Sequence, residues 1–158
     1  MSRAVTAVAL ALLAGCGFQL RGQAPLPAVS AAPYVETEDR YSALYAALDR
    51  RLRAAGARPA TSAAGASVVI RLHVDDTGRE LLSVTADNKP GEYEVYYAAE
   101  YSVTNGATEL ISRKQVKLTR DYAYDESAVL AKEHEEESLR VALAGEIADL
   151  ILRRLAAL

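Results

Sequence analysis

Few residues of this 158-residue chain could do chemistry: it has one cysteine, Cys16, and two histidines, His73 and His134. His73 lies in an alternating stretch beside Arg71, which favours a solvated or hydrogen-bonded strand residue over a catalytic one. His134 lies in the acidic run KEHEEES, which lacks the second histidine of the zinc motif H-E-x-x-H and is typical of a solvated helix start. We therefore expect no catalytic residue, no metal site and no cofactor, and a protein that is not an enzyme.

Cys16 follows a stretch typical of a secretory signal peptide. Arg3 precedes an apolar run, residues 4–14, which is shorter than the roughly 20 residues needed to cross a bilayer. The tetrapeptide LAGC, residues 13–16, resembles the bacterial lipobox, and this resemblance implies a diacylated Cys16 thiol, cleavage before it and acylation of the new N-terminus. We predict a lipoprotein signal peptide over residues 1–15. The alternative is an ordinary secreted protein with a cysteine near its cleavage site.

Composition limits the function further. The formal net charge is −3, whereas nucleic-acid-binding proteins normally carry a basic surplus, so we expect no nucleic-acid partner. The chain has nine tyrosines, one phenylalanine and no tryptophan, and tyrosine suits half-buried sheet faces and interfaces. The lipobox resemblance adds an expectation about location: in many Gram-negative lipoproteins an aspartate after the cysteine suggests retention in the inner membrane. Gly17 and Phe18 follow Cys16 instead, so this resemblance implies the outer membrane.

Two helices are expected. The first begins after a cap at Asp39 and ends before Gly56 and Pro59. Its apolar face comprises Tyr41, Leu44, Tyr45, Leu48 and Leu52. The second spans about residues 128–155, with glutamates near its start and arginines near its end that complement the helix dipole. Its apolar stripe comprises Leu130, Leu139, Leu143, Ile147, Leu150, Ile151 and Leu155.

Between the helices, apolar and polar residues alternate with the period of strands that bury one face. The expected buried positions are Val68, Ile70, Leu72 and Val74; then Tyr93, Val95, Tyr97, Ala99, Tyr101 and Val103; then Val116, Leu118, Tyr122 and Tyr124. Residues 83–91 form the first turn and Asn105-Gly106 the second.

A short strand at 34–36 would complete the sheet. These elements predict an α+β fold, a two-layer sandwich in which a mixed, largely antiparallel sheet of about four strands packs against two helices. We divide the mature chain into a lipidated tether, residues 16–33, and a single domain, residues 34–158.

Three stretches carry a resemblance to a known family. They are CGFQLRG at residues 16–22, GEYEVYYAAEYSV at 91–103 and YDESAVLAKEHEEESL at 124–139. Together they resemble the LptE family of lipopolysaccharide-assembly lipoproteins of Gram-negative bacteria. The resemblance implies an outer-membrane, lipid-anchored and periplasm-facing protein that plugs the LptD β-barrel, helps it to assemble and binds lipopolysaccharide.

The same resemblance implies a lipopolysaccharide-binding site. Lys132 occupies the lysine position of the LAK motif, whereas Ala86 stands where better-known members carry arginine in the first turn. Lys89 lies in the same turn and could substitute, although lysine lacks the bidentate fork of arginine. Each lysine could instead be an ordinary surface residue, Lys132 balancing neighbouring glutamates.

Two other functions stay open from the sequence. One is a lipoprotein subunit of another envelope machine, such as an ABC-type lipid-transport auxiliary lipoprotein, which does not require the joint CGFxLRG and LAKxxEE pattern. The other is a periplasmic hydrolase, which would need a nucleophile and base pair that the sequence does not reveal.

Overall fold

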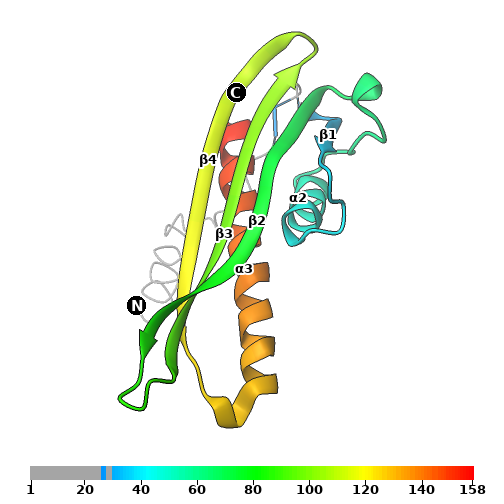
Figure 1. Cartoon of the computed structure of the whole chain (residues 1–158). Coiled ribbons are helices and arrows are strands. Elements are labelled where there is room, and N and C mark those ends of the chain that lie inside the picture. Colours follow the sequence, from blue (N-terminus) through cyan, green and yellow to red (C-terminus); the bar gives the residue numbers. More distant parts are fainter. Residues whose placement is uncertain (1–25, 28–29) are drawn as a thin grey trace, which may run out of the picture.

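A computed structural model describes residues 26–27 and 30–158 (Figure 1). The predicted signal peptide, the lipid attachment at Cys16 and most of the predicted tether lie outside these residues. The described part contains one four-stranded sheet with the order β1-β2-β3-β4. Its strands are β1 (Pro33–Glu36), β2 (Val68–Val84), β3 (Pro90–Asn105) and β4 (Thr108–Ala123). The pair β1 and β2 is parallel and the other two pairs are antiparallel.

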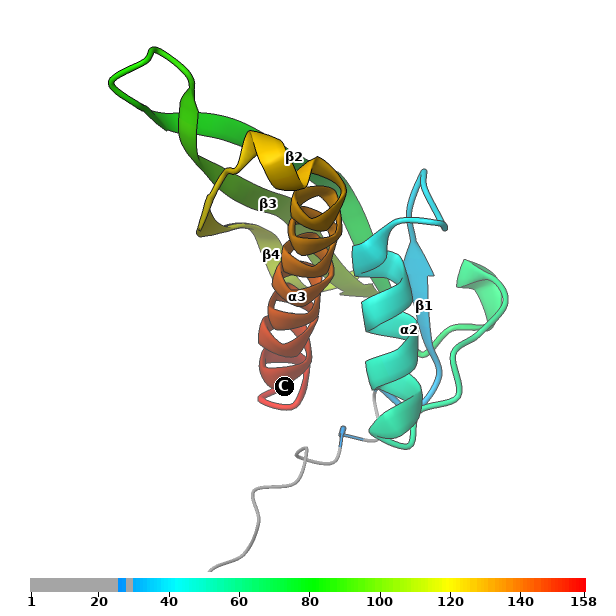
Figure 2. The ribbon, with the colours of Figure 1, turned by 90° about the horizontal axis from the view of Figure 1, so that it is seen from below.

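Both long helices cover the same face of this sheet (Figure 2). They are α2 (Ala43–Ala54) and α3 (Val129–Leu155), and short 3-10 turns occur at η2 (Ala63–Gly65) and η3 (Glu126–Ala128). The prediction of a two-layer α+β sandwich with a mixed, largely antiparallel sheet is therefore confirmed. In the described part of the chain, no helix is both long and apolar enough to span a membrane.

The core lies between the helices and the covered face of the sheet. In β3 the predicted alternation holds, since Val95, Tyr97, Ala99, Tyr101 and Val103 are buried. They pack against buried residues of both helices, which are Leu44, Ala47, Leu48, Leu52, Leu143, Ala144, Ile147, Ala148, Ile151, Leu152 and Leu155. Burying each large aliphatic side chain contributes about 1.5–3 kcal/mol, so this apolar layer is the main source of stability.

The strand β2 contains a β-bulge that the sequence did not reveal. Between Leu72 and Val74 the register with β3 shifts, and His73 is the extra residue. Because side chains alternate with a period of two, one extra residue exchanges the two faces of the strand as far as Leu81, after which the register shifts again. Val74 therefore lies on the uncovered face with 40% of its surface exposed, and its predicted place in the core was wrong. Asp75 takes the side that faces the helices.

The helix α2 begins at Ala43 rather than just after Asp39. Its N-cap is Ser42, whose Oγ accepts a hydrogen bond from the backbone N of Tyr45 at 3.0 Å. Asp39 instead accepts from the backbone N of Tyr41 at 2.7 Å, in the turn before the helix. The predicted cap was wrong, and so was the place of Tyr41 on the apolar face, because Tyr41 is 98% exposed.

The bulge in β2 explains this choice of cap. Asp75 accepts a hydrogen bond from Ser42 Oγ at 2.5 Å and another from the hydroxyl of Tyr97 at 2.7 Å. The Tyr97 oxygen in turn accepts from the backbone N of Leu44 at 3.1 Å. Two backbone donors of the first helical turn are thus satisfied by a network that ends on the sheet.

Both predicted turns are present, with shifted bounds. The first is shorter than residues 83–91, because β2 continues to Val84 and β3 starts at Pro90. In the second, Asn105 pairs with Thr108, and the two central residues are 106 and 107. Gly106 has a φ of +55°, which glycine adopts without strain.

The helix α3 matches its predicted range, but its first three turns do not match the predicted pattern. Leu130, expected in the apolar stripe, is 74% exposed. The first turn carries no acidic residue, so the glutamates lie too far along to complement the dipole at the helix start. Arg153 and Arg154 do occupy the last turn, as expected.

Candidate functional site

The structure brings the two predicted binding lysines to the same end of the molecule. Lys89 lies in the turn between β2 and β3, and its Nζ donates to Glu126 at 2.6 Å. Glu126 begins η3, which leads directly into the turn of α3 that carries Lys132. Figure 1 shows the tip of this hairpin and the start of α3 at the same end. We call residues 81–91 and 124–135 the hairpin end.

Each lysine of the hairpin end has a carboxylate partner. Lys132 Nζ donates to Glu135 at 2.8 Å, and its side chain is only 21% exposed. Hydrogen bonds from Ser127 lower the pKa of Asp125, and the charge of Lys132 contributes to the same shift. The hydrogen bond to Glu126 raises the pKa of Lys89. Lys89 is therefore a cation near neutral pH.

The hairpin end also exposes apolar side chains. Those in β2 are Leu81, Leu82 and Val84, and those at the start of α3 are Val129 and Leu130. Exposed apolar groups gathered beside cations mark interaction sites more often than scattered single residues do. This combination suits a ligand that carries both anionic groups and hydrocarbon. Ala86, where the family resemblance places arginine, is exposed in the same turn.

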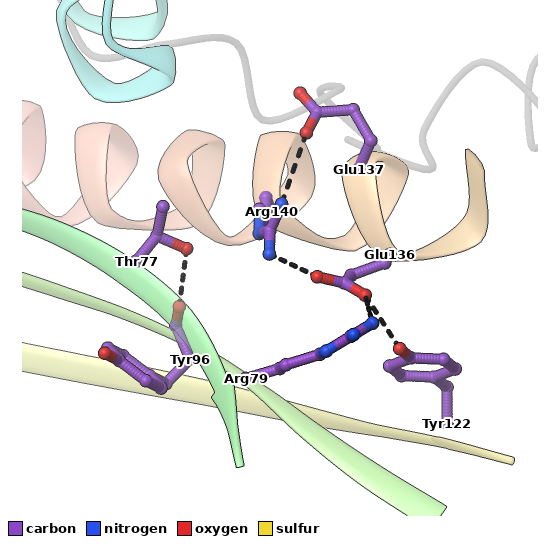
Figure 3. A network of polar contacts seen from close by, with 7 residues as sticks. All are labelled: Thr77, Arg79, Tyr96, Tyr122, Glu136, Glu137 and Arg140. Atoms are coloured by element: carbon purple, nitrogen blue, oxygen red, sulfur yellow. Dashed lines mark hydrogen bonds and ion pairs between the residues drawn. The ribbon is translucent and has the colours of Figure 1, made fainter. Parts of the chain in front are cut away.

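Next to the hairpin end lies a buried carboxylate that sequence reasoning missed. Glu136 is 5% exposed, so its predicted place in a solvated acidic run was wrong. Arg79 Nη1 donates to its Oε2 at 2.7 Å, and the hydroxyl of Tyr122 donates to the same oxygen at 2.8 Å. Arg140, one turn further along α3, donates to the other oxygen. Figure 3 shows these donors converging from β2, β4 and α3.

Aromatic rings surround this ion cluster. The guanidinium of Arg79 lies 4.7 Å from the centroid of the Tyr93 ring, which is a cation–π distance. The Tyr93 ring stacks on Tyr122, with centroids 5.9 Å apart, and meets Tyr124 edge-on at 5.3 Å. We call Arg79, Tyr93, Tyr122, Glu136 and Arg140 the Glu136 cluster.

The charges of the cluster stabilise one another. Burial alone would raise the pKa of Glu136, but the hydrogen bonds from Tyr122 and Arg79 and the charge of Arg140 bring it below its ordinary value. Burial and the bond to Glu136 raise the pKa of Tyr122, and the bond to Glu136 raises that of Arg79. Glu136 is therefore ionised at neutral pH, between two cations.

The two histidines have structural surroundings. His73 lies within hydrogen-bond distance of Ser102, with 2.8 Å between Nε2 and Oγ, which confirms a hydrogen-bonded strand histidine. The sequence did not reveal this pair, because Ser102 lies on the neighbouring strand. In the described residues no carboxylate accepts a hydrogen bond from His73, so the orienting acid of a catalytic triad has no counterpart. His134 is exposed, and the described part of the chain contains no cluster of potential metal ligands.

A polar hollow of about 350 Å³ lies at the opposite end of β2 from the hairpin end. Its lining comprises Glu36, Thr37, Glu38, Arg71, Leu72, His73 and Arg113. Arg71 pairs with Glu36 at 2.6 Å, and Arg113 pairs with Glu100. The cations of the hollow are thus paired, as those of the hairpin end are, but the only aliphatic residue in its lining is the buried Leu72, so the hollow lacks the exposed apolar side chains of the hairpin end.

The fold is shared with solved bacterial lipoproteins. The rare lipoprotein B of Shewanella oneidensis is 28% identical, with a TM-score of 0.68 over 80% of this chain and 94% of that chain. Lipoprotein B of Nitrosomonas europaea is 25% identical, with a TM-score of 0.70 over 89% of this chain and 91% of that chain. The chain thus has the α+β fold of a class of bacterial lipoproteins.

The family follows from sequence similarity. The model of the LptE family, described as lipopolysaccharide-assembly, matches residues 32–155, so the chain belongs to this family. A Pectobacterium atrosepticum protein named LPS-assembly lipoprotein LptE is 25% identical over 152 residues, which are 96% of this chain and 82% of that protein. The predicted resemblance is confirmed. The chain is a lipopolysaccharide-assembly lipoprotein of the cell envelope.

Proposed function

We infer that this chain is a non-enzymatic outer-membrane lipoprotein, anchored through Cys16, that plugs an LptD-like β-barrel and helps it to assemble. In this role it binds lipopolysaccharide through Lys132 and Lys89 for delivery to the outer leaflet. Family membership supports the assembly role. Membrane attachment rests on the lipobox, because several acyl chains on one cysteine make release negligible, whereas one chain binds only marginally.

The observation that carries the binding proposal is the composition of the hairpin end. Lys89 and Lys132 are 43 residues apart in the sequence, yet the contact between Lys89 and Glu126 brings their segments together. The same two segments expose leucines and valines. Lipopolysaccharide offers phosphates to the lysines and acyl chains to the apolar groups, so one ligand satisfies both kinds of side chain.

The two lysines are not equivalent in this proposal. Lys132 is partly buried, so its stem is held in place and its ammonium loses little freedom when it binds a phosphate. Lys89 is more exposed and sits in a tight turn, where Thr85 N donates to Lys89 O at 2.7 Å. We expect Lys132 to contribute more than Lys89. Both lysines exchange a carboxylate partner for the ligand.

The partner is tested by purification from membranes. A tagged full-length chain is extracted from gently solubilised outer membranes, and the proteins that accompany it are identified by mass spectrometry. We expect one large β-barrel in equal amount that stays bound at high salt. Inner-membrane transporter subunits in its place would contradict the plug and favour an ABC-type lipid-transport auxiliary role. The anchor is tested with Cys16→Ala, secreted behind an ordinary cleavable signal peptide and without the barrel that would otherwise retain it. This variant is expected in the soluble fraction, and its retention in the membrane would refute the anchor.

A further inference from the structure

Glu136 is the second glutamate of the LAKxxEE motif, and it has no role in the lipopolysaccharide binding proposed above. It is also the only buried residue in the first half of α3, since the next buried position is Leu143. A carboxylate is costly to bury, and it is tolerated here because charged and neutral donors satisfy both oxygens. The first half of α3 therefore meets the rest of the fold through Glu136 and through Leu139, which is only half-buried against the core.

The partners of Glu136 belong to the strands that lead into the hairpin end. Arg79 lies in β2 two residues before Leu81, where the hairpin end begins. Tyr122 lies at the end of β4, just before Tyr124 and η3. Figure 3 shows Arg79 reaching across from β2 to α3. A change at Glu136 thus acts on both segments that carry the binding lysines.

Lys132 depends on the same contact because of its place on the helix. It precedes Glu136 by four residues, and residues four apart lie on the same helix face, one turn from each other. Lys132 is accordingly half-buried, whereas His134 between them is exposed. The rotation of α3 that directs Glu136 toward Arg79 also directs Lys132 toward the hairpin.

A second contact spans the same gap, but it is weaker. Lys89 and Glu126 form an ion pair in which both side chains are exposed. Exposed ion pairs contribute about 0–1 kcal/mol, and salt screens them further. The ion pair between Lys89 and Glu126 also breaks if Lys89 binds a phosphate. The Glu136 cluster is therefore the contact that persists when the site is occupied.

We propose that Glu136 is a positioning residue, which holds Lys132 in a fixed place relative to the Lys89 turn without touching lipopolysaccharide. This inference rests on the proposed function for its consequence, the affinity for lipopolysaccharide. The geometric part of the inference, that Glu136 fixes the position of Lys132 relative to the Lys89 turn, does not depend on any ligand. The two parts are therefore tested by separate measurements on the same variants.

The geometric test uses spin labels at two exposed sites of the full-length protein in detergent, introduced as Ala86→Cys and His134→Cys. The same labelling reaction on a chain without these two substitutions measures any label attached to Cys16. We expect a narrow distribution of label distances in the parent and a broad one in Glu136→Gln. The matched control is Glu137→Gln, the same change one residue along. Glu137 is exposed and touches the cluster through a 3.8 Å ion pair with Arg140, which contributes little in solvent, so this variant should leave the distribution narrow.

The functional test measures the affinity of the same variants for purified lipopolysaccharide. Since coupling between sites is commonly about 5–150-fold, we expect Glu136→Gln to weaken binding roughly tenfold and Glu137→Gln to leave it unchanged. Tyr122→Phe keeps the ring and removes one donor, so it should change both readouts less and in the same direction. It also keeps the test decisive if Glu136→Gln does not fold.

The outcomes separate the two proposals. An unchanged distance distribution in the Glu136 and Tyr122 variants would refute the positioning role, because a purely structural contact lowers stability without moving the labels in the folded protein. A broad distribution with full affinity would also refute it. Failure of the unaltered chain to bind lipopolysaccharide would refute the proposed function, and the label distances would still decide whether Glu136 holds the two segments.

Discussion

The two halves of α3 are attached to the sheet by opposite means. From Leu143 to Leu155 the helix buries seven apolar side chains and Gly145 against the strands and α2, whereas from Val129 to Arg140 it buries only Glu136. Apolar packing is strong and non-directional, so the second half stabilises the fold. Hydrogen bonds are directional, so the contacts of Glu136 also fix how the first half of α3 is rotated relative to the sheet. The binding lysine lies in this first half.

The same division appears along the sheet. Near β1 the covered face of the sheet is apolar, and toward the hairpin end it becomes polar and aromatic, with Arg79, the stacked pair Tyr93 and Tyr122, and Tyr124 edge-on to Tyr93. Stability is thus concentrated away from the proposed site, which leaves the hairpin end free to expose apolar groups and cations. A substitution at the hairpin end can therefore weaken ligand binding without unfolding the protein.

The largest effect is expected from the apolar half. Ile147 is fully buried, and Ile147→Ala removes contacts and leaves a cavity, which should lower the free energy of unfolding by about 2–5 kcal/mol. Urea denaturation followed by circular dichroism measures it. Val141→Ala, on an exposed part of the same helix, should change stability by less than about 0.5 kcal/mol. Equal losses from the two variants would remove the distinction between the halves.

A smaller loss is expected from the polar half. Glu136→Gln keeps the shape but removes the charge that satisfies Arg79 and Arg140, which should lower the free energy of unfolding by about 1–3 kcal/mol. The same denaturation experiment with Glu137→Gln provides the control. If Glu136→Gln were as stable as the parent, the cluster would not hold the first half of α3.

The contribution of Glu136 should also depend on pH. Its pKa is lower in the folded state than in the unfolded state, so the ionised form contributes stability that is complete above about pH 5. This stability is lost as the pH falls through the lowered pKa of Glu136. The stability difference between the parent and Glu136→Gln should therefore shrink from pH 7 to pH 3. A difference that grew toward low pH would contradict the sign of the shift.

The smallest effect on stability is expected at Lys132. Its ion pair with Glu135 joins two residues of one helix, and such pairs contribute only about 0.2–0.5 kcal/mol. Lys132→Asp should therefore unfold at nearly the same urea concentration as the parent. A loss comparable to that of Ile147→Ala would show that Lys132 is structural, and any change in its binding could then be read as partial unfolding.

Sequence reasoning predicted the apolar half of the molecule better than the polar half. Periodicity located the strands, the helices and the buried positions of β3, because one repeated pattern determines which face is covered. It misplaced Val74, because a bulge inserts one residue without leaving a signal in the side chains. It also placed Leu130 in the core and Glu136 in solvent, because burial of a carboxylate depends on donors such as Arg79 that lie far away in the sequence.

The site was predicted by a different route. The resemblance named Lys132 and Lys89, but no local pattern could show that their segments meet, since this depends on the contact of the hairpin turn with η3. The exposed leucines of β2 look in the sequence like the end of an ordinary strand. Only the fold shows that these leucines are exposed and that they lie at the same end of the molecule as the two lysines.

The most direct test of the account is the affinity of the full-length protein for purified lipopolysaccharide, compared between the parent, Lys132→Asp and Lys114→Asp. Lys114 is an exposed lysine of β4 outside the hairpin end, so its variant makes the same charge change elsewhere. We expect Lys132→Asp to weaken binding strongly, because a carboxylate would face the ligand phosphates, and Lys114→Asp to bind like the parent. Equal affinities for all three would remove Lys132 from the site, and with it the proposal that the hairpin end binds lipopolysaccharide.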